Sequence, residues 1–236
     1  MIRLLKRPRP SPRPAPPAVE HRTKFHDDLD ALEEEMRRMA TQAATSLERS
    51  VGALLSADVA LCERVIADDD RIDAAYQRIE RHAVDIIGRQ QPVASDLRLV
   101  VGLMQVALHL ERIGDMAVDV ATASRSSMGL PGDGDILGGV QEMGEIAIAM
   151  TDQAVEAFIQ RDQAWCEQLT RQDDRVDALN RGMVGHVLGL GGDSRRLEWA
   201  LRMFQVSRYL ERAADHAVDI AEQAWFLTTG EIRELD

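Results

Sequence analysis

Three carboxylates recur at the same spacing in two places along the chain. Residues 111–121 read ERIGDMAVDVA and residues 211–221 read ERAADHAVDIA, with seven of the eleven positions identical. All the acids belong to the identical positions: Glu111, Asp115 and Asp119 in the first row, and Glu211, Asp215 and Asp219 in the second. A spacing of i, i+4 and i+8 places carboxylates above one another on one face of a helix. Such a row can bind a metal cation through oxygen ligands.

Two shorter acidic pairs accompany the rows. Residues 58–74 and 162–178 are identical at nine of seventeen positions, and they contain the i, i+4 pairs Asp69/Asp73 and Asp173/Asp177. Like charges at this spacing destabilise a helix by roughly 0.2–0.5 kcal/mol per pair. A cation at 1,000 times its dissociation constant stabilises the fold by about 4 kcal/mol, which outweighs that repulsion. We therefore predict divalent or iron cations at these ten carboxylates; the alternative is a solvated acidic face.

The repeats themselves favour the metal prediction over that alternative. Core positions differ between the copies, for example Ile113 against Ala213 and Val120 against Ile220, whereas all three acids of the row persist. The apolar positions of the first copy put Asp115 about 200° around the helix from its core residues. We therefore expect both rows to point away from the core and to lie on the surface.

The residues that adjoin the rows have simpler interpretations. Arg112 and Arg212 are expected to balance the local negative charge. His216 replaces Met116 of the first copy; it could be a ligand in the second row only, but a surface histidine is the preferred interpretation. Cys62 and Cys166 fall near the apolar stripe, and we predict that they are core thiols.

The elements that carry these residues are predicted to be long amphipathic helices. Apolar residues recur at steps of three and four, and only two prolines, Pro92 and Pro131, follow residue 17. Breaks are expected near 56–58, 92–95, 126–135, 161–162 and 189–193, with Ser95 and Asp193 as N-caps. These breaks give six helices, and the break at 126–135 divides them three and three. We predict an all-α fold of two tandem, pseudo-symmetric three-helix bundles, residues 21–127 and 135–230.

The N-terminal segment differs in composition from the rest of the chain. Six of the eight prolines lie in residues 8–17, among several arginines. Such a segment has little to bury and favours polyproline conformations over helix. We predict a disordered, basic, Pro-rich tail over residues 1–20.

The overall composition excludes several classes of function. The chain has 236 residues, 45% hydrophobic and 4% aromatic, with a net charge of −12. This acidity argues against a nucleic-acid surface. No run of 18 apolar residues is present to span a membrane, and two distant cysteines are typical of a reducing compartment. We expect a cytoplasmic protein that contacts membranes only through its partners.

Four segments resemble the PhoU family: ADDDRID at 67–73, GRQQPVASDLRLV at 88–100, HLERIGDMAVDVA at 109–121 and YLERAADHAVDIAE at 209–222. The resemblance implies two three-helix bundles, metal clusters at the paired Glu/Asp-x-x-x-Asp motifs and a homodimer. It also implies a negative regulator of the phosphate-starvation response. Its partners would be the ATPase subunit of the phosphate ABC transporter and a sensor histidine kinase. The second half has GLGGDSRRLEW in place of the Gln-Pro and Asp-Leu-Arg element, so the two sites need not be equivalent.

Two other classes of function remain as alternatives. A ferritin-type di-iron enzyme needs Glu-x-x-His motifs in the bundle core, and no glutamate of this chain has histidine three residues on. Because no nucleophile–base pattern is present either, we predict a protein that is not an enzyme and has no catalytic residues. A metal-binding helical bundle with a carboxylate-bridged site, or a structural or oligomerisation module serving another transporter, would leave the same sequence pattern.

Overall fold

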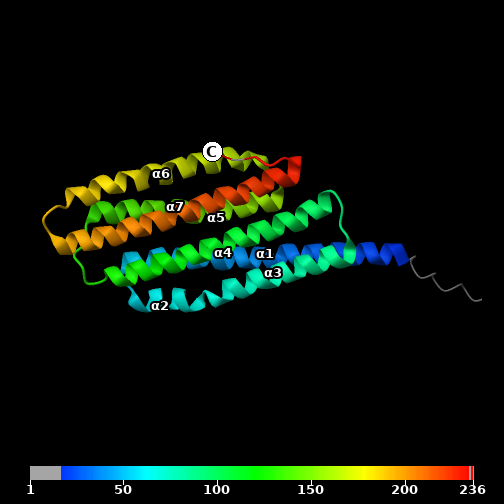
Figure 1. Cartoon of the computed structure of the whole chain (residues 1–236), viewed down its shortest axis with the longest axis horizontal. Helices are drawn as coiled ribbons and strands as arrows, with labels where there is room; N and C mark the ends of the chain where they lie inside the picture. Colours follow the sequence, from blue (N-terminus) through cyan, green and yellow to red (C-terminus); the bar gives the residue numbers. More distant parts are fainter. Residues whose placement is uncertain (1–16, 234, 236) are drawn as a thin grey trace, which may run out of the picture.

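The computed structural model describes residues 17–233 and 235. Within these residues the chain forms helices and no strand, which confirms the all-α prediction. Most of the helices lie side by side along one long axis (Figure 1). The elements are α1 (Pro17–Ser56), α2 (Val59–Asp68), α3 (Asp70–Gln90), α4 (Ser95–Ser127), α5 (Gly134–Gln160), the short 3-10 helix η1 (Gln163–Trp165), α6 (Cys166–Gly189) and α7 (Ser194–Thr229).

The two halves form two three-helix bundles that lie side by side (Figure 1). The first contains α1, α4 and the segment α2–α3; the second contains α5, α6 and α7. The segment α2–α3 is a single predicted helix that is interrupted at Asp69. The Asp69 carbonyl accepts backbone hydrogen bonds from Ile72 and Asp73 at the start of α3. With that interruption, the pattern of six long helices is confirmed.

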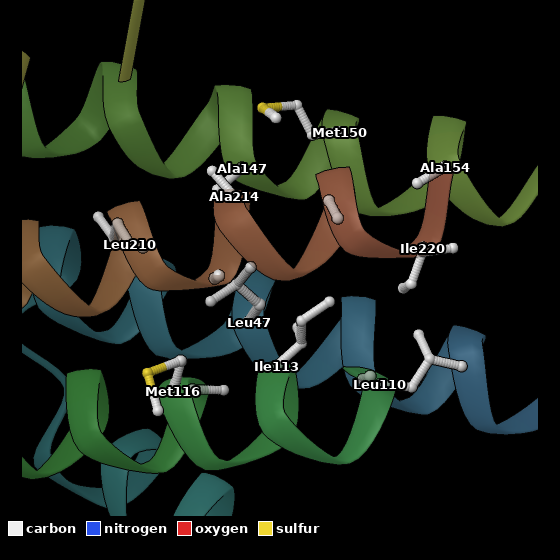
Figure 2. Packing of buried hydrophobic residues seen from close by; sticks show 14 of the residues in the cluster. Leu47, Leu110, Ile113, Met116, Ala147, Met150, Ala154, Leu210, Ala214 and Ile220 are labelled. Carbon is white, nitrogen blue, oxygen red and sulfur yellow. The ribbon is translucent and has the colours of Figure 1, made fainter. Parts of the chain in front are cut away.

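One hydrophobic core runs through both bundles. α4 packs more extensively against α7, in the other bundle, than against any helix of its own, and α1 also contacts α5. Figure 2 shows buried side chains from α1, α4, α5 and α7 that fill the space between these helices. The repeat-equivalent residues Leu110 and Leu210 are both fully buried. The halves are therefore docked through their apolar stripes.

Two glycines permit close approach between helices. A Cβ built on Gly144 of α5 would lie 2.9 Å from both methyl groups of Val51 on α1, across the boundary between the bundles. A Cβ on Gly114 of α4 would lie 3.0 Å from Ile72 Cδ1 and 3.6 Å from Asp69 Oδ1. Gly114 therefore lets α3 bring the Asp69 carboxylate directly against α4.

The helix ends test the predicted caps. Asp193 is the N-cap of α7, as predicted, and its Oδ1 accepts from the backbone N–H of Arg195 at 3.0 Å and of Arg196 at 3.2 Å. The prediction of Ser95 as an N-cap is wrong, because Ser95 is already the first residue of α4. The preceding Ala94 has a φ of 48° and makes no side-chain cap hydrogen bond. A cap residue normally has extended backbone geometry, which this turn does not provide.

The predicted tail overlaps the first helix. α1 begins at Pro17, so residues 17–20 are helical and the predicted boundary at residue 20 is wrong. Proline is well tolerated in the first turn of a helix, where its missing N–H would have no intrahelical partner. The rest of the predicted tail, residues 1–16, lies outside the described residues. The described helices contain no apolar stretch of the length that a bilayer-spanning helix requires.

Candidate metal centres

The first carboxylate cluster lies between α3 and α4 and contains Asp69, Asp73, Glu111 and Asp115. Burial raises the pKa of Asp69 to about 6, and the negative charges of Asp73 and Asp115 add to this effect. Burial also raises the pKa of Glu111, with Asp115 the strongest charged neighbour. The mutual effects show that acids from two helices share one electrostatic environment.

The second carboxylate cluster repeats this arrangement between α6 and α7 and contains Asp173, Asp177, Glu211 and Asp215. The pKa of Asp173 is raised to about 6. Burial is the largest cause, and the negative charges of Asp215 and Asp177 add to it. The pKa values of Glu211 and Asp215 are raised by burial and by nearby carboxylates. The duplication seen in the sequence is therefore also a duplication of two acidic sites in space.

Three buried carboxylate oxygens in these clusters make no hydrogen bond, Glu111 Oε2, Asp173 Oδ1 and Glu211 Oε2, although Arg112 Nε lies at ion-pair distance, 3.4 Å, from Glu111 Oε2. Buried polar atoms normally have a partner, and a buried charge without one is costly. A bound cation would supply that partner through oxygen ligands, the donor type that hard and borderline metals accept. The residues present therefore fit a cation, although its occupancy and identity stay predictions.

Arginine side chains form ion pairs with some of the carboxylates in each cluster. Arg112 Nη1 donates to Asp115 Oδ2 at 2.9 Å, and its Nε lies 3.4 Å from Glu111 Oε2. This pairing confirms the expected charge balance at Arg112. In the second cluster Arg208 Nη1 donates to Glu211 Oε1 at 2.7 Å. Arg212, by contrast, acts on Asp119 in the other bundle. Its positive charge lowers the pKa of Asp119, but burial has the larger effect and the pKa is raised overall.

The expectation that both rows lie on the open surface is wrong at their first residue. Only 18% of the Glu111 side chain and 13% of the Glu211 side chain is exposed. These side chains point away from the core seam, but α3 and α6 pack on that flank. Packing of a third helix against each row, which helical periodicity alone does not reveal, accounts for the burial.

The third acid of each row points away from the first, although its charge and that of the second acid still interact. Each step of four residues turns the side chain by about 40°, so the third carboxylate is rotated about 80° from the first. Asp119 and Asp219 therefore lie near the α4–α7 interface, where each interacts with a residue of the other bundle. The ten predicted carboxylates thus divide into two flanking clusters of four and a central region that contains Asp119 and Asp219.

The central region contains a group that the sequence did not predict, which we call the His₂Asp cluster: His109, His216 and Asp219. His109 Nδ1 and His216 Nδ1 each lie 3.2 Å from Asp219 Oδ2, and the two Nδ1 atoms are 3.3 Å apart. Burial raises the pKa of Asp219, but hydrogen bonds from both histidines reverse the effect and hold it well below its usual range. The preferred interpretation of His216 as a surface histidine is therefore wrong.

His109 carries no repeat signal, because its equivalent in the second half is Tyr209 and no duplicated pattern marks it. Only the docking of α4 on α7 brings it to His216. Among the described residues, this is the only group of three His, Cys, Asp or Glu side chains whose ligand atoms all lie within 4.8 Å of one another. The carboxylates of the two clusters thus lack such a compact three-ligand arrangement in this structure.

The two cysteines take no part in these sites. Cys62 and Cys166 are both buried in the core, which confirms the prediction of core thiols. Burial raises the pKa of each thiol and so favours the protonated form, which is a poor metal ligand.

The chain is similar to known proteins along most of its length. A PhoU domain model matches residues 36–124 and again residues 140–224. Two curated relatives are named phosphate-specific transport system accessory protein PhoU homologs. Homolog 2 of Mycobacterium tuberculosis is 34% identical over 218 residues, 89% of this chain and 98% of the relative. Homolog 1 of Mycobacterium leprae is 33% identical over 222 residues, 91% of this chain and 97% of the relative.

Solved structures agree with the fold described above. The crystal structure of PhoU from Pseudomonas aeruginosa has a TM-score of 0.80 and 29% identity, and it covers 88% of this chain and all of that one. The phosphate transport system regulatory protein PhoU from Streptococcus pneumoniae has a TM-score of 0.81 at 23% identity, with 89% and 99% covered. At that identity the second likeness bears on the fold alone.

Proposed function

The chain belongs to the PhoU family, and on this basis we propose that it regulates phosphate transport as an accessory protein of a phosphate-specific transport system. More specifically, it acts in the cytoplasm as a negative regulator of the phosphate-starvation response. It does so as an adaptor between the ATPase subunit of the phosphate ABC transporter and a sensor histidine kinase. The names of relatives that share about a third of their residues with this chain support the first statement. The resemblance of its motifs supports the second.

The geometry supports a binding role. Each bundle carries a partly buried acidic cluster on its flank, and one core holds the two clusters in fixed relation. We infer that bound cations set the surface charge to which a partner protein binds. In the first cluster the cations are held by Asp69, Asp73, Glu111 and Asp115. Asp173, Asp177, Glu211 and Asp215 play the same part in the second cluster. A bound cation neutralises negative charge; the carboxylates hold it and the arginines beside them orient the acids.

Exposed apolar side chains offer a second element of a docking surface. Leu97 and Val101 lie one turn apart near the start of α4 and are exposed. Leu197 and Leu201 occupy the equivalent positions on α7 and are exposed too. Their recurrence at equivalent positions in both halves is what supports this surface, since single exposed apolar residues are common on proteins. We infer that these faces meet the transporter and kinase, or a second copy in a homodimer.

A phosphatase reporter under control of the starvation response tests this proposal. In phosphate-rich medium, deletion of the gene should raise the reporter, and the wild-type gene should restore repression. An unchanged reporter in the deletion strain would overturn the phosphate assignment while leaving the fold intact. Complementation with Asp69→Asn/Asp173→Asn then examines the clusters. The matched control, Asp70→Asn/Asp174→Asn, alters exposed neighbours on the same two helices and should complement fully.

A further inference from the structure

The three ligand atoms of the His₂Asp cluster form a nearly equilateral triangle. Its sides are 3.2, 3.2 and 3.3 Å, between His109 Nδ1, His216 Nδ1 and Asp219 Oδ2. Zinc binds imidazole nitrogen and carboxylate oxygen at about 2.0–2.2 Å in tetrahedral geometry, which separates neighbouring ligand atoms by about 3.3–3.5 Å. The observed triangle is therefore close to one face of a zinc tetrahedron, and an ion could bind all three atoms with little movement of α4 or α7.

We propose that His109, His216 and Asp219 form a third metal site, which binds a borderline divalent transition metal of the zinc class and links the two bundles. Two imidazoles and one carboxylate suit zinc, whereas the all-oxygen clusters on the flanks suit harder cations. The site is distinct from both carboxylate clusters, since its ligands come from α4 of one bundle and α7 of the other. It does not depend on the proposed role in phosphate regulation.

The hydrogen bonding of the metal-free cluster is incomplete in a way that a cation resolves. A neutral imidazole carries one N–H. If both histidines donate from Nδ1 to Asp219, their two N–H groups face each other across 3.3 Å. If one Nδ1 instead accepts from the other, it gives up its own bond to the carboxylate. A metal ion replaces these protons and satisfies all three atoms together.

Solvent can reach the cluster. The side chains of His109 and His216 are 17% and 20% exposed, and that of Asp219 is 41% exposed. His216 also borders a surface hollow of about 440 Å³, where the carboxylates of Asp115 and Asp119 offset the charges of Arg112 and Arg212. An ion therefore has a route from solvent, and the fourth tetrahedral position would be left to water.

The repeat supplies an internal control. One hundred residues away from the ligands, the equivalent positions are held by Tyr209, Met116 and Asp119. This set offers a carboxylate but no imidazole, and zinc favours nitrogen and thiolate donors alongside carboxylate. We therefore expect the site on one side of the pseudo-twofold only, which gives a stoichiometry of one histidine-dependent zinc per chain.

Isothermal titration of the full chain, stripped with a chelator, tests the proposal with Zn²⁺ as the probe. The variants are His109→Ala, His216→Ala and Asp219→Asn, with Asp135→Asn, an exposed acid on α5 outside all three sites, as the control. Each ligand variant should lose one zinc or bind it at least ~100-fold more weakly, since even outer-shell partners contribute 10–100-fold. Asp135→Asn should bind as the wild type does. Circular dichroism establishes that each variant is folded. One folded histidine variant is enough to test whether zinc binding depends on the histidines.

X-ray absorption of protein loaded with one equivalent of zinc identifies the ligands independently of affinity. Nitrogen ligation by two imidazoles in the wild type that decreases in His109→Ala supports the site. Oxygen-only ligation, or histidine variants that titrate as the wild type does, would overturn it and leave a purely hydrogen-bonded cluster. Equal losses in Asp135→Asn and Asp219→Asn would overturn it as well, because the effect would then follow charge and not coordination.

Discussion

Asp119 of α4 and Asp219 of α7 occupy equivalent positions in the two repeats, yet their pKa values are shifted in opposite directions. Burial raises both. The negative charge of Asp115 raises the pKa of Asp119 further. Hydrogen bonds from His109 and His216 instead hold the pKa of Asp219 below its usual range. Two histidines thus make one half of a duplicated structure electrostatically different from the other at its centre.

The raised pKa values of Asp69 and Asp173 predict how stability depends on pH. Both are about 6 in the folded chain, against about 3.9 for an unperturbed aspartate. The folded state binds these protons more tightly, so the stabilisation is full below about pH 4 and is lost as the pH rises through about 6. Metal-free protein should therefore be more stable at pH 5 than at pH 7.5. We expect about 1 kcal/mol per site after solvent screening.

Thermal unfolding in chelator at both pH values measures this effect, which corresponds to roughly 2–4 °C per kcal/mol. Asp69→Asn/Asp173→Asn should remove most of the difference, whereas Asp70→Asn/Asp174→Asn should keep most of it, because the charges of Asp70 and Asp174 are smaller causes of the raised pKa values than burial. A wild-type melting temperature that rises from pH 5 to pH 7.5 would contradict the prediction.

Divalent cations should stabilise the chain through the two carboxylate clusters. Mn²⁺ prefers oxygen ligands, and at 100 times its dissociation constant a bound ion adds about 2.7 kcal/mol to the free energy of unfolding. We expect the Mn²⁺-dependent rise in melting temperature to fall in Asp73→Asn/Asp177→Asn and to persist in Asp70→Asn/Asp174→Asn. An equal rise in both variants would mean that the clusters are only a solvated acidic face.

Gly144→Ala should destabilise the chain by about 1–3 kcal/mol, because the new methyl group would overpack α5 against α1. The clash lies at 2.9 Å from both methyl groups of Val51. A Cβ on Gly138 of the same helix would meet nothing within 4 Å, so Gly138→Ala should stabilise by about 0.5–1 kcal/mol through helix propensity. Urea denaturation compares the two. Similar effects of both substitutions would show that the α1–α5 contact yields easily.

The two helix starts should respond differently to alanine. Asp193→Ala removes hydrogen bonds to two backbone N–H groups of α7 and should cost about 1 kcal/mol. Ser95→Ala removes no cap hydrogen bond and should change the free energy of unfolding by less than about 0.5 kcal/mol. Chemical denaturation distinguishes the two, and a larger effect at Ser95 than at Asp193 would contradict the cap geometry of these two turns.

The periodicity of the sequence was sufficient to predict the helices and the duplicated three-helix architecture. Apolar residues at steps of three and four depend on local geometry, which is why the helices, the buried cysteines and the Asp193 cap could be predicted. The interruption at Asp69 could not, because an aspartate within a periodic stretch gives no local signal of a break.

The candidate sites were predictable only within one helix. The pairing of Asp69 and Asp73 with Glu111 and Asp115 followed from adjacency of helices in a bundle. The separation of Asp219 from its row, and its contact with His109, depend on how α4 docks on α7. That docking is set by the shapes of two apolar stripes over their whole length, so no spacing along the chain encodes it.

The docking of α4 on α7 has a consequence for how the chain folds. Since the most extensive contact of α4 is with the other half, neither bundle can bury its apolar stripe alone. A half-chain would expose the residues that now form the centre of the common core, and it would be covered only by a second half-chain. We therefore expect the two halves to fold as one cooperative unit, so that removal of either half should unfold the other or cause it to pair with a second copy.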